Sequence, residues 1–214
     1  MRLERYDALI RLAAHLPKDA LMMSTYIGAV SFEWAAITEE HPQTAQLGQM
    51  GDVIGMAVGL ALALPHRKVA CLDGDGSVLM ELGQLVAMGQ EAPDNLVVFV
   101  IDNGVYESIG SGKTGPRATA TSGKTDLAAL ARGSGVPYAV NVDTAEGLER
   151  ELNLAFSQKG CRFINIKIPP GHARIAPRQS DGFENKYRFV RHVEALERKQ
   201  ILHLARQDRQ LMKK

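Results

Sequence analysis

The stretch Lys68-Val69-Ala70-Cys71-Leu72-Asp73-Gly74-Asp75-Gly76-Ser77 passes from an apolar run into a glycine-rich turn. A second apolar run, residues 96–101, ends at Asp102-Asn103. Short apolar runs bounded by turn residues are typical of buried strands in a parallel sheet. Two such strands would deliver Asp75 and Asn103 to one edge of the sheet, where open α/β sheets bind phosphorylated ligands. Because these oxygen ligands leave room for phosphate and water, the pair predicts a Mg²⁺–diphosphate site.

The rest of the chain alternates strand and helix patterns, which predicts an α/β fold with an open parallel sheet and helices on both faces. We expect helices at residues 3–16, from 31 onward, and at 50–64, 79–88, 126–132 and 144–156, and strands at 20–24, 68–73, 96–102, 138–142 and 163–168. A loop of roughly twenty residues rich in Gly, Ser, Thr and Lys follows the 96–102 strand. Loops of this length inside a domain are usually functional or mobile.

The sheet pattern ends at Pro169-Pro170-Gly171, which divides the chain into a domain at 1–170 and a C-terminal helical extension at 171–214. The extension is basic, with eleven Lys or Arg residues against five Asp or Glu residues. Its apolar residues recur at helical spacing, at Phe183, Tyr187, Val190, Val193, Ile201 and Leu204. A nucleic-acid-binding tail and a helix packed on another subunit both fit this pattern. The apolar stripe needs a partner, which favours packing.

The composition, with 214 residues, 45% hydrophobic residues and a net charge of +1, predicts one sizeable compact domain with an extension. No apolar run approaches the ~18–20 residues needed to cross a bilayer, and residues 1–6 lack the layout of a signal peptide. Cys71 and Cys161 both fall in apolar strand patterns, which predicts buried thiols in a reducing compartment. We therefore expect a cytoplasmic protein that binds neither membrane nor nucleic acid.

Two short segments imitate the end of a P-loop, Gly112-Lys113-Thr114 and Gly123-Lys124-Thr125. A P-loop needs a glycine five residues before its second glycine. Those positions hold Glu107 and Ala118 here, so we interpret both lysines as loop residues.

A diphosphate-binding motif like that of thiamine-diphosphate enzymes is recognisable here: the sequence resembles it in the run Gly74-Asp75-Gly76-Ser77 and in Asn103, which follows the next strand. The resemblance covers roughly residues 1–170, and it implies thiamine diphosphate and Mg²⁺ as cofactors. Asp75 and Asn103 match the side-chain metal ligands of the family, whereas Asp73 ranks well below Asp75. Val105 falls where a backbone carbonyl completes the metal's protein ligands. The alternative is a pair of ordinary strand-to-helix turns.

The same resemblance assigns residues to the rest of the cofactor. Gly74, Gly76 and Ser77 match the turn that holds the diphosphate through amides and a hydroxyl, and Tyr106 would line the phosphate pocket or simply pack. In Leu47-Gly48-Gln49-Met50-Gly51, Gly48 matches the carbonyl that accepts from the cofactor's amino group. Met50 matches the wedge that bends the cofactor; the other interpretation is a core methionine at a helix start.

The family's activating glutamate belongs to a separate pyrimidine-binding domain, and no segment here resembles it. Glu33, Glu81 and Glu107 are the nearest carboxylates by motif position, and none lies on a matching segment. The resemblance therefore implies half an active site, with no certain catalytic residue in this chain and a pyrimidine-domain (alpha) subunit as its partner in a hetero-oligomer.

The first strand and the segment Ile27-Gly28-Ala29-Val30-Ser31-Phe32-Glu33 resemble the opening of sulfopyruvate decarboxylase beta subunits and of the corresponding domain in phosphonopyruvate decarboxylases. Those enzymes act on small 2-oxo acids with an anionic head. Phe32 replaces an arginine of their pattern, and a phenyl ring does not reproduce arginine's bidentate fork. The departure puts the substrate in doubt and leaves the subunit architecture intact.

The leading hypothesis is the diphosphate- and Mg²⁺-binding subunit of a decarboxylase that converts a small 2-oxo acid into an aldehyde and CO₂. An acetolactate-synthase-like carboligase and a non-catalytic regulatory subunit are the alternatives. His41, His66 and His172 are candidates for the proton donor, with His41 first because it shortly precedes the cofactor turn.

Overall fold

The computed structural model of the chain describes residues 3–26, 28–47, 49–107, 115–171, 173 and 181–202. The helices are α1 (Arg5–His15), α2 (Ala29–Thr38), α3 (Val53–Ala63), α4 (Asp75–Met80), α5 (Gly83–Glu91), α6 (Leu127–Gly133), α7 (Ala145–Ser157) and α8 (Gly182–Glu197), with a 3₁₀ turn η1 (Ala120–Ser122). The strands are β1 (Leu21–Thr25), β2 (Thr44–Leu47), β3 (Val69–Gly74), β4 (Leu96–Asp102), β5 (Val105–Tyr106), β6 (Arg117–Ala118), β7 (Tyr138–Val142) and β8 (Arg162–Lys167). In this part of the chain no helix has both the length and the apolar character needed to span a bilayer.

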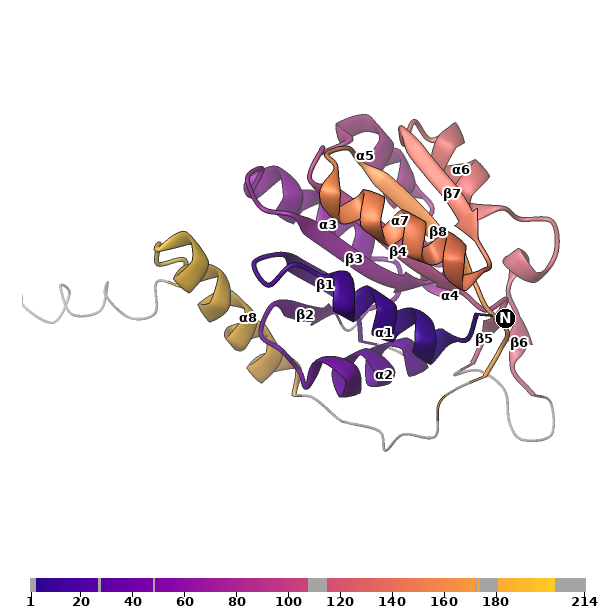
Figure 1. Cartoon of the computed structure of the whole chain (residues 1–214), viewed down its shortest axis with the longest axis horizontal. Helices are drawn as coiled ribbons and strands as arrows, with labels where there is room; N and C mark the ends of the chain where they lie inside the picture. The colour runs from indigo at the N-terminus through magenta and orange to yellow at the C-terminus, as the bar shows by residue number, and fades with distance from the viewer. Residues whose placement is uncertain are drawn as a thin grey trace, which may run out of the picture.

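The main sheet has six strands in the order β2-β1-β3-β4-β8-β7, and every neighbouring pair is parallel. Helices α1, α2 and α7 cover one face, and α3, α5, α6 and α8 cover the other (Figure 1). All seven residues of β4 are buried because the strand is central and both of its faces are covered. Its side chains alternate between the layers: Val98 belongs to one apolar cluster and Phe99 to the other. The expected open parallel α/β sheet is confirmed.

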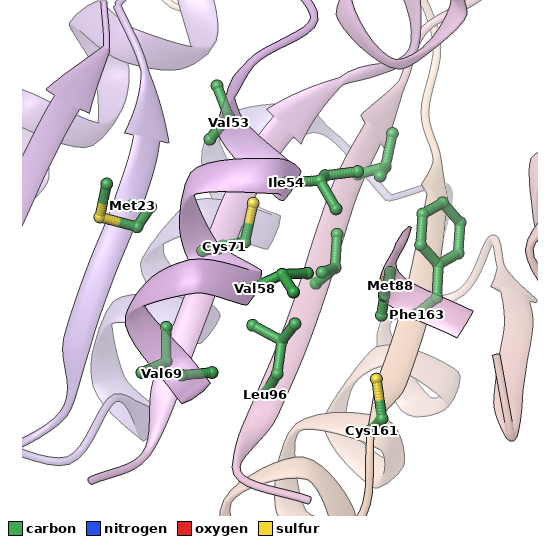
Figure 2. Close-up of a cluster of buried hydrophobic side chains, with 14 of the residues drawn as sticks. Met23, Val53, Ile54, Val58, Val69, Cys71, Met88, Leu96, Cys161 and Phe163 are labelled. Atoms are coloured by element: carbon green, nitrogen blue, oxygen red, sulfur yellow. The ribbon is translucent and has the colours of Figure 1, made fainter. Parts of the chain in front are cut away.

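The α3 side of the sheet holds both cysteines. Figure 2 shows Cys71 and Cys161 in the cluster of buried apolar side chains on this side of the sheet. Both thiols are buried and free, and burial raises the pKa of Cys161 to about 12. The prediction of two buried thiols is confirmed.

Three parts of the fold differ from the sequence expectation. Strand β2 was not expected, because Thr44-Ala45-Gln46-Leu47 is short and polar and forms only the edge of the sheet. The helix expected at 79–88 is two helices, α4 and α5, separated at Glu81-Leu82. The long loop after β4 contains the small antiparallel pair β5–β6 and the turn η1.

The C-terminal helix α8 packs on the edge strand β2 of its own chain (Figure 1). Asn185 bonds the strand directly: its Oδ1 accepts from the Gln46 amide at 2.8 Å, and its Nδ2 donates to the Thr44 carbonyl at 3.2 Å. Val193 is buried against the sheet side, whereas Phe183 is 77% exposed. The expected stripe is thus divided between intrachain packing and solvent, and its contact with a partner subunit stays a prediction.

Candidate cofactor site

The carboxyl-terminal edge of the sheet brings the predicted site together. In the β3–β4 register Gly74 pairs with Ile101, so Asp75 and Asn103 follow adjacent strands at the same height. One cleft at this edge is lined by every predicted cofactor or metal residue that the structure describes: Met50, Gly74, Asp75, Gly76, Ser77, Asn103, Val105 and Tyr106. Gly48 lies outside the described residues.

Asp75 occupies the first turn of α4 with its side chain buried. Its Oδ2 accepts hydrogen bonds from Thr119 Oγ1 at 2.7 Å and Thr121 Oγ1 at 2.9 Å. Burial raises the pKa of Asp75, while the two hydroxyl hydrogen bonds lower it. The threonines were missed by the sequence analysis because nothing in their local pattern relates them to a carboxylate more than forty residues away.

Asn103 begins a tight turn beyond β4. Its Oδ1 accepts from the Val105 amide at 3.0 Å, and Gly104 between them has φ +72°, a conformation that side chains other than glycine's rarely adopt. The turn fixes the amide oxygen at the cleft and returns the chain into β5 with Val105. The short β5–β6 ladder then pairs Val105 with Ala118.

The donor set fits Mg²⁺, a hard cation that binds oxygen and usually keeps waters and phosphate oxygens in its coordination sphere. It consists of a carboxylate from Asp75, an amide oxygen from Asn103 and the carbonyl of Val105. No three His, Cys, Asp or Glu side chains of the described residues form a metal-binding group. A divalent ion here therefore needs ligands from a bound diphosphate or water as well.

Ser77 connects the two turns of the site. Its hydroxyl donates to Asp73 Oδ2 at 2.9 Å and accepts from the Gly51 amide at 2.9 Å. With its one proton used, the hydroxyl cannot also donate to a phosphate, so of Ser77 only the backbone amide remains as a donor for that purpose. Burial raises the pKa of Asp73 to about 7, against the hydrogen bonds from Ser77 and the Gly74 amide that lower it.

Gly76 lies directly under the ring of Tyr106. A Cβ atom at residue 76 would stand 2.5 Å from Tyr106 Cε1, which is closer than atoms can approach. A side chain at residue 76 would therefore force the Tyr106 ring to shift, and Tyr106 both lines the cleft and packs against this turn.

The carboxylates closest to the motifs are engaged in contacts within the chain. Arg5 of α1 binds Glu33 through two nitrogens at 3.1 and 3.0 Å and donates from Nη1 to both oxygens of Glu107 at 2.9 Å. Glu107 lines the cleft, so this buried arginine joins α1, α2 and the cleft wall. Glu81 accepts from the Gly83 amide. The Arg5 contacts could not be predicted from a local sequence pattern, since the partners lie 28 and 102 residues away.

The start of α2 is a further part of the cleft wall that the sequence analysis missed. Gly28, Ala29 and Val30 line the cleft, and Gly28 precedes the helix with φ +88°. The sequence feature that could have indicated this wall is Gly28, the glycine shortly after the first strand. His41 and His66 do not line the cleft: His41 stacks edge-on against His192, and His66 pairs with Glu197. His172 lies outside the described residues.

Comparison with known proteins agrees with this geometry. A family model described as the C-terminal TPP-binding domain of thiamine pyrophosphate enzymes matches residues 26–166. The chain belongs to the thiamine pyrophosphate enzymes. The resemblance inferred from the GDGS and Asn103 motif is confirmed.

Among the relatives of this thiamine pyrophosphate enzyme chain are two kinds of decarboxylase. It is 37% identical over 167 residues to phosphonopyruvate decarboxylase of Streptomyces viridochromogenes, which covers 78% of this chain and 40% of that protein. It is 31% identical over 187 residues to sulfopyruvate decarboxylase subunit beta of Methanocaldococcus jannaschii, which covers 87% of this chain and 95% of that subunit. The chain thus spans less than half of the first relative and nearly all of the second.

Solved structures of thiamine pyrophosphate enzymes share the fold. Benzoylformate decarboxylase from Polynucleobacter necessarius superimposes with a TM-score of 0.65 at 18% identity, over 81% of this chain and 34% of that one. A thiamin diphosphate-dependent enzyme from Mycobacterium smegmatis gives a TM-score of 0.63 at 22% identity, over 78% of this chain and 32% of that one. At these identities the likeness supports the fold alone.

Proposed function

We propose that this chain is the diphosphate- and Mg²⁺-binding subunit of a thiamine-diphosphate-dependent decarboxylase acting on a small 2-oxo acid. The observation that carries the proposal is that all eight described residues of the predicted cofactor and metal site line one cleft. The names of the relatives, phosphonopyruvate decarboxylase and sulfopyruvate decarboxylase subunit beta, support the reaction class.

The chain's own residues would bind one end of the cofactor. Asp75, Asn103 and the Val105 carbonyl would hold Mg²⁺, and the amides of Gly76 and Ser77 would face the diphosphate at the start of α4. Met50, which lines the same cleft, would support the reacting rings from the α3 side. Bound thiamine diphosphate supplies an electron sink for the loss of CO₂, and the protein supplies orientation and exclusion of water.

We propose that a pyrimidine-domain subunit completes the site. The cleft has a volume of about 70 Å³, whereas pockets that enclose drug-sized ligands measure about 300–1,000 Å³. Its walls therefore suit the metal and diphosphate end rather than a whole cofactor. Neither Glu33 nor Glu107 is free to activate the cofactor, because Arg5 binds both. The partner would bring the activating glutamate.

The outer face of α3 supports a partner on that side. Met56 and Leu62 are 53% and 47% exposed, and α3 and α8 border an apolar groove of about 600 Å³. Exposed apolar surface of this kind is typical of interaction sites. The groove includes Leu47, next to the cofactor turn, so a subunit covering it would reach the site.

The substrate class is a 2-oxo acid of about three carbons that carries an anionic or polar head. The relatives' names support sulfopyruvate or phosphonopyruvate. Phe32, in place of an arginine in the family pattern, favours a less charged head.

Assay of the co-expressed subunits with thiamine diphosphate, Mg²⁺ and a panel of 2-oxo acids tests this function. Stoichiometric CO₂ and aldehyde from the complex, and neither from this chain alone, is the expected result. A condensation product formed only when an acceptor carbonyl compound is added would replace decarboxylation by carboligation. No turnover of any acid by a complex that binds cofactor would leave a non-catalytic subunit.

A further inference from the structure

Two threonine hydroxyls meet one oxygen of the Asp75 carboxylate. Thr119 and Thr121 both donate to Oδ2, at 2.7 and 2.9 Å, and their own oxygens lie 2.8 Å apart. Both threonines are buried, at 4% and 7% exposure. Each hydroxyl has a single proton, so two protons serve three contacts: at least one is donated to Asp75 Oδ2, and the other goes to Oδ2 or to the neighbouring hydroxyl. This arrangement stabilises an ionised carboxylate and fixes its rotation.

The pair leaves the other oxygen of Asp75 distinct. Oδ2 lies within hydrogen-bonding distance of both threonine hydroxyls, and no side-chain donor among the described residues is directed at Oδ1. The other donor to the carboxylate is the backbone amide of Gly76, in the same turn. A carboxylate that binds a metal through one oxygen is commonly held through the other by hydrogen bonds, and loss of such support typically lowers metal affinity 10–100-fold. The geometry therefore distinguishes the two oxygens: Oδ2 accepts the hydroxyl hydrogen bonds, and Oδ1 is left to contact a metal ion.

The threonines are placed by the same hairpin that carries Val105. The β5–β6 ladder pairs Val105 with Ala118, and the next residue, Thr119, donates its amide to the Gly104 carbonyl at 2.8 Å. Ser122 Oγ donates to the Thr119 carbonyl at 2.8 Å and closes the η1 turn that contains Thr121. The hairpin thus positions Val105, whose carbonyl is one proposed metal ligand, together with the threonines that contact Asp75, another proposed ligand.

We propose that Thr119 and Thr121 are positioning residues for the metal site: they hold Oδ2 of Asp75 so that Oδ1 is presented to the divalent ion. The proposal rests on the proposed function, since it assumes that Asp75 binds the metal. The segment 115–123 is then part of the cofactor site through this hydroxyl pair, although no thiamine-diphosphate motif was recognised in it.

The test uses Mn²⁺ as a probe, with free Mn²⁺ counted by electron paramagnetic resonance in the presence of thiamine diphosphate and the full complex. The variants are Thr119→Val, Thr121→Val, their double variant, and Thr119→Ser. Valine keeps the shape and removes the donor, whereas serine keeps the donor. Thr38→Val is the matched control, because the Thr38 hydroxyl donates only to the Trp34 carbonyl within α2, away from the cleft.

The expected result is a 10–100-fold weaker Mn²⁺ affinity for the double valine variant, smaller losses for the single variants, and near wild-type affinity for Thr119→Ser and Thr38→Val. Circular dichroism melting of each variant separates loss of metal binding from loss of the fold. Wild-type affinity in a folded double variant overturns the proposal and leaves the proposed function standing. Failure of the wild-type complex to bind Mn²⁺ with thiamine diphosphate overturns both.

Discussion

The hydroxyl of Ser77 accepts a hydrogen bond from the backbone N–H of Gly51 at 2.9 Å, which ties the turn after β3 to the turn before α3. The first turn contains Asp75 and the second contains Met50. The turn proposed to hold the metal and the diphosphate is thus connected through one side chain to the turn whose Met50 is proposed to support the cofactor's rings. Asp73 completes the connection, because its Oδ2 accepts a hydrogen bond from the Ser77 hydroxyl.

Ser77→Ala should destabilise the chain by about 1–3 kcal/mol, because it leaves the buried Asp73 carboxylate and the Gly51 amide without this partner. Urea unfolding of the cofactor-free chain measures the change. Ser157→Ala, at the exposed end of α7, is the control and should stay within about 0.5 kcal/mol. Equal stability of the Ser77 variant and the wild type would show that the two turns hold their positions without the hydroxyl.

Gly76→Ala should cost about 1–3 kcal/mol through overpacking against the Tyr106 ring. In a double-mutant cycle the cost should shrink when Tyr106→Ala is already present, since the obstructing ring is gone. Gly133→Ala is the matched control, because nothing lies within 4 Å of a Cβ there. Additive losses would contradict the contact between Gly76 and Tyr106.

Arg5→Met should destabilise the fold by about 3–5 kcal/mol, because the buried Glu33 and its neighbour Glu107 lose the cation they share. Arg11→Met on the same helix tests the opposite case. Its pair with Glu149 is 40% exposed on both sides and is expected to contribute at most about 1 kcal/mol. Chemical denaturation measures the free energy of unfolding of both variants. Equal losses would contradict the claim that burial makes the Arg5 ion pairs more important than the exposed Arg11 pair.

The pH dependence of the metal-free chain should report Asp73. Its folded pKa of about 7 lies above the ordinary aspartate pKa of 3.8, so the folded state binds the proton more tightly than the unfolded state. The stabilisation is complete below about pH 4 and is lost as pH rises towards 7. Asp73→Asn should remove this slope between pH 4 and 7.

Asp126→Asn provides the comparison of opposite sign. The pKa of Asp126 is lowered by the Ala129 amide at the start of α6, so its contribution is present above about pH 4 and is lost in acid. Unfolding free energies measured from about pH 2 to 8 should separate the two variants, because the Asp126 contribution is lost below about pH 4 and the Asp73 contribution between about pH 4 and 7. A wild-type slope in Asp73→Asn would contradict the buried, protonated state.

Much of the fold could be predicted because its central strands are written as continuous apolar runs. The observed β4 and β7 have the expected bounds, and the motif correctly placed Asp75 and Asn103 at one edge. The edge strand β2 was not predicted because its polar residues interrupt any continuous apolar run. The roles of Arg5, Thr119 and Thr121 could not be predicted for another reason. Their partners are distant in sequence, and a hydroxyl or guanidinium directed at a buried carboxylate produces no local sequence pattern.

The most direct test of the central claim is calorimetric titration of thiamine diphosphate with Mg²⁺ into this chain, alone and together with a pyrimidine-domain partner. Tight binding only in the complex, abolished by Asp75→Ala in a chain that still folds, is the result that half an active site predicts. Absence of binding in the complex, or binding that Asp75→Ala leaves intact, would contradict it.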